Sequence, residues 1–132
     1  MISLNTIKTL LASRLGQVPD LPRVIWTDQP HDDMIGEPHI LAQIAGVERR
    51  PVDGCTIRTS GRLRVQVRYP TGEAALAERA GAAIERAFPA NGSLLDLTHG
   101  LATDWCCAGG VISDGAWHTC PVAVAWSAYS EG

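Results

Sequence analysis

The segment RLRVQVRYPTG, residues 62–72, constrains the fold more than any other part of this chain. Apolar and polar side chains alternate along it, and successive side chains of a β-strand point to opposite faces of a sheet. One face holds Leu63, Val65, Val67 and Tyr69, and the other holds Arg62, Arg64, Gln66 and Arg68. The segment therefore predicts a strand with one face on a core and three arginines on the other.

The chain has 132 residues, which suits one domain over residues 1–132 with a real hydrophobic core. Hydrophobic residues make up 45% and charged residues 19%, as in globular proteins, and no apolar run is long enough to cross a bilayer. The N-terminal segment has no secretion-signal pattern, so we expect the protein to stay in the cytoplasm in which it is made. In that compartment Cys55, Cys106, Cys107 and Cys120 are expected to be free thiols.

The charge is unevenly distributed along the chain. The net charge is −3, yet residues 49–68 carry six arginines against Asp53 alone. Residues 90–132 contain four acids and neither lysine nor arginine. The middle of the chain and its C-terminal third therefore carry opposite charges.

The N-terminal half predicts one helix and a sheet. Apolar residues at helical spacing predict a helix over Leu4–Leu15, which Ser3 or Asn5 can cap and Gly16 and Pro19 can end. The sequence then predicts short strands at residues 24–26 and 39–47, separated by a polar loop over residues 28–37. Residues 48–61 contain Pro51, Asp53-Gly54 and Gly61, so we expect them to form the long connection of a hairpin.

The second half predicts an alanine-rich helix and a closing hairpin. Thr71 can cap the helix and Pro89 can stop it, and a short apolar segment follows near residues 94–97. The expected buried stripe of this helix consists of Leu76, Ala80, Ala83, Ile84, Ala87 and Phe88. The closing hairpin turns at Asp114-Gly115, a favoured two-residue turn.

The hairpin turn also predicts which side chains share a face. If Ser113 faces Ala116, one face holds Trp105, Cys107, Cys120, Val122, Val124 and Trp126. The other face holds Cys106, Pro121, Ala123 and Ala125. We expect an α+β fold: a single, mostly antiparallel β-sheet with two helices packed on one face. Both faces are apolar, and two helices usually cover only one, so something else must cover the remainder.

Two clusters have metal-ligand chemistry. Cys106, Cys107, His118 and Cys120, with His99 nearby, could bind zinc. Adjacent cysteines of a strand point to opposite faces, and the expected register sets Cys120 across from Gly109. The spacing therefore favours the interpretation that these cysteines are buried apolar residues and not zinc ligands. A bulge at Gly109-Gly110 could shift this register.

The second cluster is His31-Asp32-Asp33 with Glu37 and His39, which could serve a divalent-metal hydrolase. Catalytic ligands need rigid support and this loop has none, so a solvated loop is the preferred interpretation. No nucleophile elbow or phosphate-binding glycine motif is present. We expect no catalytic residue, no cofactor and no metal.

The arginine-rich middle leaves three interpretations open. Its residues are Arg49, Arg50, Arg58, Arg62, Arg64 and Arg68. They could form a solvated sheet face, a subunit contact with the acidic C-terminal third, or a track for DNA phosphates. No aromatic stacking platform is apparent beside the row, which weakens the case for single-strand binding.

The chain resembles the small tail terminator proteins of long-tailed, siphovirus-like bacteriophages and gene transfer agents. The segments that carry the resemblance, in chain order, are IKTLLASRLG, LPRVIWTDQP, GEPHI, GRLRVQVRYPTGEAALAERAGAAIERAFP and WHTCPVAVAW. They cover nearly the whole chain as fold-level patterns without a catalytic signature. The cysteine pair at residues 106–107 departs from the family pattern.

The resemblance implies a structural virion protein that is not an enzyme. It implies a hexameric ring of identical subunits at the head-proximal end of the tail tube, in a virion assembled in the host cytoplasm. The ring would bind the tail tube protein and the head–tail connector, would stop tube polymerisation, and would make non-specific contact with DNA in its channel. In such a ring the six arginines are subunit-interface or channel residues, and a neighbouring copy covers the spare sheet face.

Three alternatives remain. Another head–tail neck or tail-completion protein can share this size and fold. A small metal-dependent hydrolase would use the loop from His31 to His39. A DNA-binding module would use the arginine row.

Overall fold

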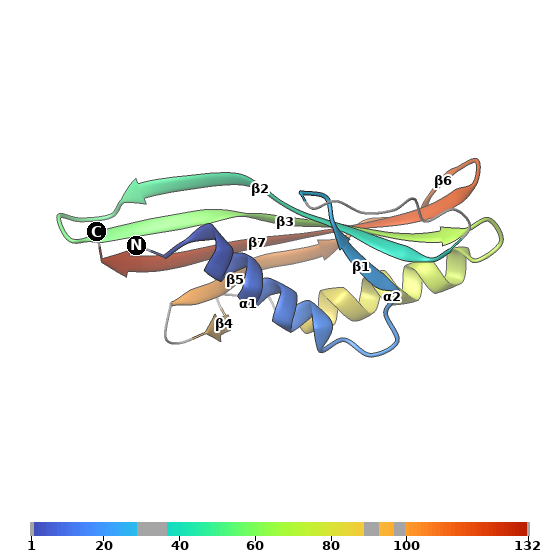
Figure 1. Cartoon of the computed structure of the whole chain (residues 1–132), viewed down its shortest axis with the longest axis horizontal. Helices are drawn as coiled ribbons and strands as arrows, with labels where there is room; N and C mark the ends of the chain where they lie inside the picture. Colours follow the sequence, from blue (N-terminus) through green and yellow to red (C-terminus); the bar gives the residue numbers. More distant parts are fainter. Residues whose placement is uncertain (1, 29–36, 89–92, 97–99, 132) are drawn as a thin grey trace.

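The computed structural model describes residues 2–28, 37–88, 93–96 and 100–131 (Figure 1). The elements, in chain order, are α1 (Leu4–Gly16), β1 (Arg23–Trp26), β2 (His39–Pro51), β3 (Thr56–Pro70), α2 (Ala74–Ala87), β4 (Ser93–Asp96), β5 (Leu101–Ala108), β6 (Ile112–Asp114) and β7 (Trp117–Glu131). The expected order of helices and strands is therefore present in the described part of the chain.

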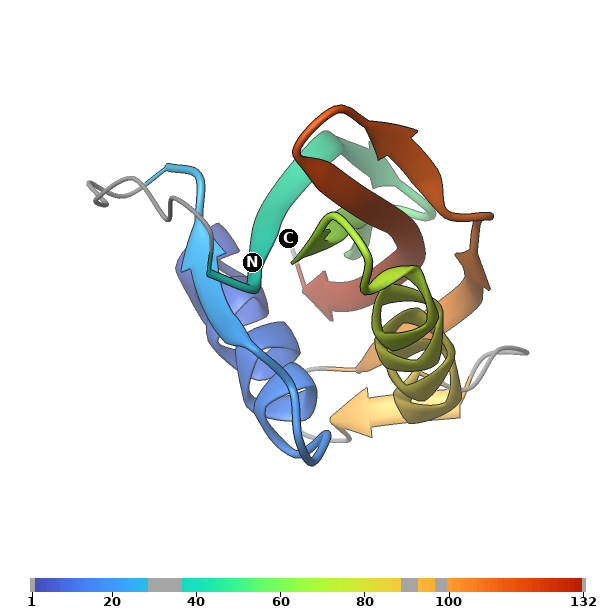
Figure 2. The ribbon, with the colours of Figure 1, turned by 90° about the vertical axis from the view of Figure 1, so that its right-hand side faces the viewer.

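The seven strands formed by the described residues belong to one sheet. Six follow the order β1-β2-β3-β7-β5-β4, and β6 pairs with β7 beyond the end of β5. Only β1 and β2 are parallel, and the other pairs are antiparallel. Both helices lie on the same side of the sheet (Figures 1 and 2). The expected α+β class, with a mostly antiparallel sheet and two helices on one face, is confirmed.

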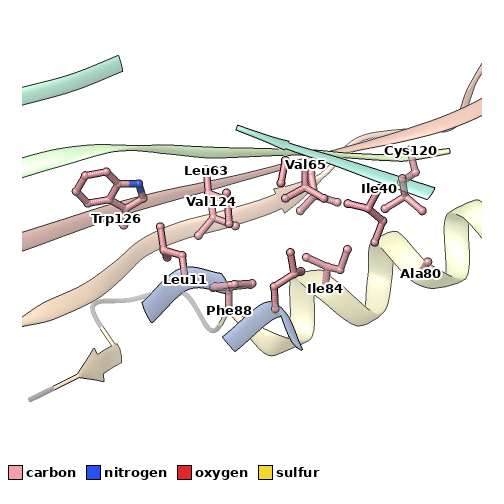
Figure 3. Packing of buried hydrophobic residues seen from close by; sticks show 14 of the residues in the cluster. Leu11, Ile40, Leu63, Val65, Ala80, Ile84, Phe88, Cys120, Val124 and Trp126 are labelled. Atoms are coloured by element: carbon pink, nitrogen blue, oxygen red, sulfur yellow. The ribbon is translucent and has the colours of Figure 1, made fainter. Parts of the chain in front are cut away.

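The alternating segment forms the C-terminal half of β3 as predicted. Leu63, Val65 and Val67 are buried on the helix side, whereas Arg62 and Arg64 are exposed. The register places Leu63 opposite Val124 and Val65 opposite Val122. Figure 3 shows Leu63, Val65 and Val124 on the side of the sheet that faces Leu11 of α1 and Ile84 of α2. The apolar residues that alternate along the strands and those that recur at helical spacing on α1 and α2 pack together in this core.

The predicted long connection over residues 48–61 is wrong. β2 continues to Pro51 and β3 begins at Thr56, so four residues join them. A bulge between Ala45 and Glu48, with Gly46 at φ +63°, shifts the register but does not end the pairing. At the tip, the Asp53 carboxylate accepts hydrogen bonds from the backbone N–H groups of residues 55 and 56. In this hairpin, Gly46 lies in the bulge, and Pro51 lies at the end of β2 just before the turn.

α1 begins as predicted, and α2 differs from the expectation. The Ser3 side chain accepts a hydrogen bond from the Thr6 backbone N–H and caps α1. Thr71 does not cap α2, because its hydroxyl donates to the Gly115 carbonyl and joins the turn before α2 to the β6–β7 turn. That connection is reinforced by His118, whose Nε2 accepts from the Gly72 backbone N–H at 3.1 Å.

The buried stripe of α2 is rotated from its expected position. Ala80, Ile84 and Phe88 are buried as expected, whereas Leu76 is 38% exposed and Ala77 and Gly81 are buried instead. The reason is a close approach to β7: a Cβ at Gly81 would lie 2.4 Å from the Cys120 sulfur. A residue without a side chain lets the helix approach the sheet at this point, so glycine belongs to the buried stripe.

The register of the closing hairpin also differs from the expectation. Asp114 pairs with Trp117, so the two-residue loop is Gly115-Ala116, and Gly109 donates its N–H to the Pro121 carbonyl. A second irregularity at Asp104 shifts the pairing between β5 and β7 again. Cys120, Val122, Val124 and Trp126 lie on the helix side together, as predicted. The expected positions of Trp105, Cys106 and Cys107 are wrong, because the shifts place Cys106 on the helix side and the other two on the opposite side.

Candidate functional site

The face of the sheet opposite the helices is the candidate site, and we call it the open face. Pairing across β2, β3, β7 and β5 places on it Leu41, Gln43, Ala45, Arg62, Arg64, Gln66, Arg68, Thr119, Pro121, Ala123, Ala125, Trp105 and Cys107. Neither of the two described helices packs there (Figure 2). Trp105 is 40% exposed and Cys107 is exposed, so an aromatic ring and a thiol face outward beside small apolar residues. The expectation that two helices leave one face uncovered agrees with this arrangement.

The structure divides the six predicted arginines between the two faces. Arg49 pairs with Thr59, and its Nη2 donates to the Ile2 carbonyl at 3.5 Å, so it lies on the helix side. The open face carries Arg50, Arg58, Arg62, Arg64 and Arg68. Arg50 and Arg58 extend the row toward the β2–β3 turn. The row is therefore longer than the strand pattern indicated, but it excludes Arg49.

Two tryptophans stack on arginines of the row, so the expectation that no aromatic stacking platform accompanies it is wrong. The guanidinium carbon of Arg62 lies 5.5 Å from the centroid of the Trp105 ring. That of Arg68 lies 5.0 Å from the centroid of Trp117, whose ring meets His39 edge-on. Such stacking stabilises a guanidinium by about 0.5–2 kcal/mol. The two aromatic rings belong to β5 and β7, so the side-chain pattern of β3 does not indicate them.

Arg64 lies between these stacked pairs. No ion pair or ring contact of its guanidinium is found among the described residues, and the side chain is exposed. Beside it lies a shallow depression of about 440 Å³, lined by Arg64, Val65, Gln66, Trp105, Cys107, Gly109, Pro121, Val122 and Ala123. The centre of the open face thus combines an apolar hollow with a cation that its own chain leaves available.

In the acidic C-terminal third, one aspartate contacts an arginine of the same chain. Asp104 lies at the β5 bulge, where it accepts from Ser127 at 2.9 Å and meets Arg58 at 3.5 Å. It therefore pairs with one arginine of the row of its own chain. The side chains of Asp96 and Glu131 lie outside the described residues, and Asp114 is exposed at the β6–β7 turn.

A different acidic pair lies at the edge formed by α2 and β5. Glu78 and Glu85 are exposed and seven residues apart, which places them on one side of α2. Glu85 accepts the Ala108 backbone N–H at 2.7 Å and so covers part of the free edge of β5. Burial, together with these two carboxylates, raises the pKa of the Cys120 thiol. We call Glu78 and Glu85 the acidic edge; helical spacing could have indicated it, but only the fold shows which strand it borders.

The cysteine cluster does not form a metal site among the described residues, and most of the His31–His39 cluster lies outside them. No group of three or more histidine, cysteine, aspartate or glutamate side chains there could hold a metal ion. Cys106 and Cys107 point to opposite faces, and His118 is engaged by Gly72 and Ser113. His31, Asp32, Asp33 and His99 lie outside the described residues. His39 is buried, with its Nδ1 2.9 Å from the Glu37 carbonyl oxygen.

The two adjacent cysteines provide a test of the observed register. Burial, with the nearby charges of Glu85 and Cys107, raises the pKa of the Cys106 thiol to about 12. Because the thiolate is the reactive form, iodoacetamide applied to dilute protein near about pH 8 is expected to modify Cys55 and Cys107 and to spare Cys106 and Cys120. Intact mass and peptide mapping measure this. Modification of Cys106 ahead of Cys107 would support the register expected from the turn and contradict the observed one.

Within the described residues, no helix is long and apolar enough to cross a membrane. No family model matches the chain, and no curated protein matches it. Solved structures do match. One chain, 21% identical, aligns over 97% of this protein and 96% of its own length with a TM-score of 0.68. Its designation is a serial identifier that states no function. At this identity the similarity shows the fold alone, across nearly the whole chain.

Proposed function

We propose that this protein is a tail terminator of a long-tailed bacteriophage or gene transfer agent, a structural virion protein without catalytic activity. Identical copies form a ring, expected to be hexameric, on the head-proximal end of the tail tube. There the ring stops tube polymerisation and joins the tail to the head connector, while DNA passes through its channel. The virion is assembled in the host cytoplasm.

One observation carries most of the support: the open face. A sheet with helices on a single face leaves its other face to solvent or to a partner. Here that face presents a 40% exposed tryptophan, an apolar hollow and an arginine that has no ion-pair partner among the described residues. Large aromatic residues and arginine are enriched where proteins associate. An assembly protein needs such a face, and the resemblance to tail terminators indicates which assembly.

The test adds purified protein to tail tube protein from the same phage or gene transfer agent while tubes polymerise. A terminator binds the growing end, so tube growth is expected to stop at ratios far below one copy per tube subunit. Tube lengths in negative-stain micrographs measure this, with heat-denatured protein as the control. Tubes that grow to their usual lengths would reject the terminator and favour another neck or tail-completion protein.

A further inference from the structure

We propose that the open face of one copy binds the acidic edge of a second copy, so that Arg62 and Arg64 meet Glu78 and Glu85 in a head-to-tail contact. This inference rests on the proposed function, because it assigns the surfaces by which the subunits of the ring join. The sequence suggested the acidic C-terminal third of a second copy as a partner of the arginines. The proposed contact uses two glutamates of α2 in its place.

The open face provides the basic half of this contact. Its five arginines are opposed by Glu48, which pairs with Arg50 at 3.7 Å, and by Asp104, which pairs with Arg58. Among the described side chains, this pairing is confined to the end of the row near the β2–β3 turn. Toward the centre, Arg62 is held against Trp105 and Arg64 lies beside the hollow. Among the described residues, positive charge without a carboxylate partner is therefore concentrated at Arg62 and Arg64, next to the exposed Trp105 ring.

The acidic edge provides the other half. Seven residues of α-helix span about 10 Å, so Glu78 and Glu85 form a short row along one side of α2. Along β3, the Cα atoms of Arg62 and Arg64 are about 7 Å apart, and those of Arg64 and Arg68 are about 13 Å apart. The flexible arginine side chains can therefore match the spacing of the two glutamates on α2. Although Glu85 accepts one hydrogen bond from Ala108, a carboxylate has further acceptor sites for a bidentate arginine.

The positions of the open face and the acidic edge on the molecule favour a head-to-tail contact over a symmetric one. The open face is on one side of the sheet, and α2 is on the other side, packed against β3, β5 and β7 (Figure 2). Contact between two open faces would bring arginine rows together, and juxtaposed like charges cost several kcal/mol. Contact between an open face and an acidic edge joins different surfaces of two copies. Such a contact repeats from copy to copy and closes a ring when the rotation allows it.

Trp105 supplies the apolar part of the contact. The 440 Å³ hollow lies between β3 and β5, and the Trp105 ring borders it beside Arg62, Arg64 and Gln66. Tryptophan and arginine are the residue types most enriched among interface hot spots. Nucleic acid is a less suitable occupant, because the chain has a net charge of −3 and Arg58 and Arg50 are already paired with carboxylates.

Two charge-reversed variants test the contact: Arg62→Glu with Arg64→Glu, and Glu78→Arg with Glu85→Arg. Each variant carries like charges on both surfaces, so each alone is expected to associate at least about 100-fold more weakly than the natural protein. An equimolar mixture is expected to regain association, because every face then meets an edge of opposite charge in an alternating ring. Sedimentation velocity measures the assembly, and circular dichroism checks that each variant is folded.

The matched control is Arg79→Glu with Arg86→Glu, which reverses two charges on α2 outside the acidic edge and is expected to leave association unchanged. Three results would overturn the contact: a natural protein that stays monomeric up to about 1 mM, single variants that associate normally, or a mixture that stays monomeric. Normal association of the Arg62/Arg64 variant, with lost binding of a fluorescent single-stranded oligonucleotide, would assign the face to nucleic acid instead.

The tube assay separates this inference from the proposed function. Restored association in the mixture, together with tubes that grow unchecked, would keep the contact and reject the terminator. Tube growth arrested equally by the natural protein and by both single variants would keep the terminator and reject the contact.

Discussion

Replacement of Trp126 by alanine is expected to lower the free energy of unfolding by about 3–5 kcal/mol. Trp126 is fully buried on the helix side of β7 and is the largest fully buried side chain among the described residues. Its ring lies over Gly61 of β3, where a Cβ would come within 2.7 Å of the ring. Glycine at this position thus makes room for the indole, and alanine at Trp126 leaves a cavity that neither strand can fill. Chemical denaturation monitored by circular dichroism measures the change.

Trp105→Ala is the matched control for this substitution. Trp105 lies on the neighbouring strand, is 40% exposed and packs against Arg62 alone among the described cations, so its loss is expected to change unfolding by about 0.5 kcal/mol or less. Trp126→Phe is expected to cost less than Trp126→Ala, because it keeps most of the ring and removes an indole N–H that is buried without a hydrogen-bond partner. Equal costs for the two alanine variants would contradict the assignment of Trp126 to the core and Trp105 to the open face.

Replacement of Ile84 by alanine is expected to destabilise the protein by about 2–5 kcal/mol. Ile84 is fully buried beneath the sheet, where α2 contributes its side of the core (Figure 3). Leu76→Ala, on the same helix and of similar size, is expected to cost less than about 1 kcal/mol, because Leu76 is 38% exposed. Thermal and urea unfolding of the two variants measure the difference.

This pair also tests the rotation of α2. A helix in the orientation expected from the sequence would bury Leu76 and Ile84 alike, and the two substitutions would then have similar costs. A large cost for Leu76→Ala would therefore contradict the close approach of α2 to β7 at Gly81 and Cys120.

The open face connects stability to function. Residues of this face contribute little to the core of a single copy, so substitutions there are expected to leave the fold intact while they change association. Core substitutions such as Ile84→Ala are expected to reduce tube arrest only in proportion to the fraction of unfolded protein. The two classes of variant can therefore be distinguished by measuring unfolding and association on the same samples.

The sequence by itself determined the features that depend on local periodicity. Alternation in β3, helical spacing in α1 and the run of apolar residues at Cys120, Val122 and Val124 predicted the elements and their core faces, and together they predicted the α+β class with helices on one side. These signals are local because each side chain is directed by the backbone of its own element.

Only the tertiary structure decided the features that depend on register. One-residue shifts at Asp104 and near Gly109 turn Trp105 and Cys107 outward, and a bulge beside Gly46 lets β2 and β3 continue past the expected turn. A shift of one residue moves a side chain to the other face of a sheet, and no local pattern reports it. The pairing of Arg62 with Trp105 and the separation of Arg49 from the row follow from these shifts. The composition of the open face therefore depends on the strand pairing and cannot be predicted from the sequence of any one strand.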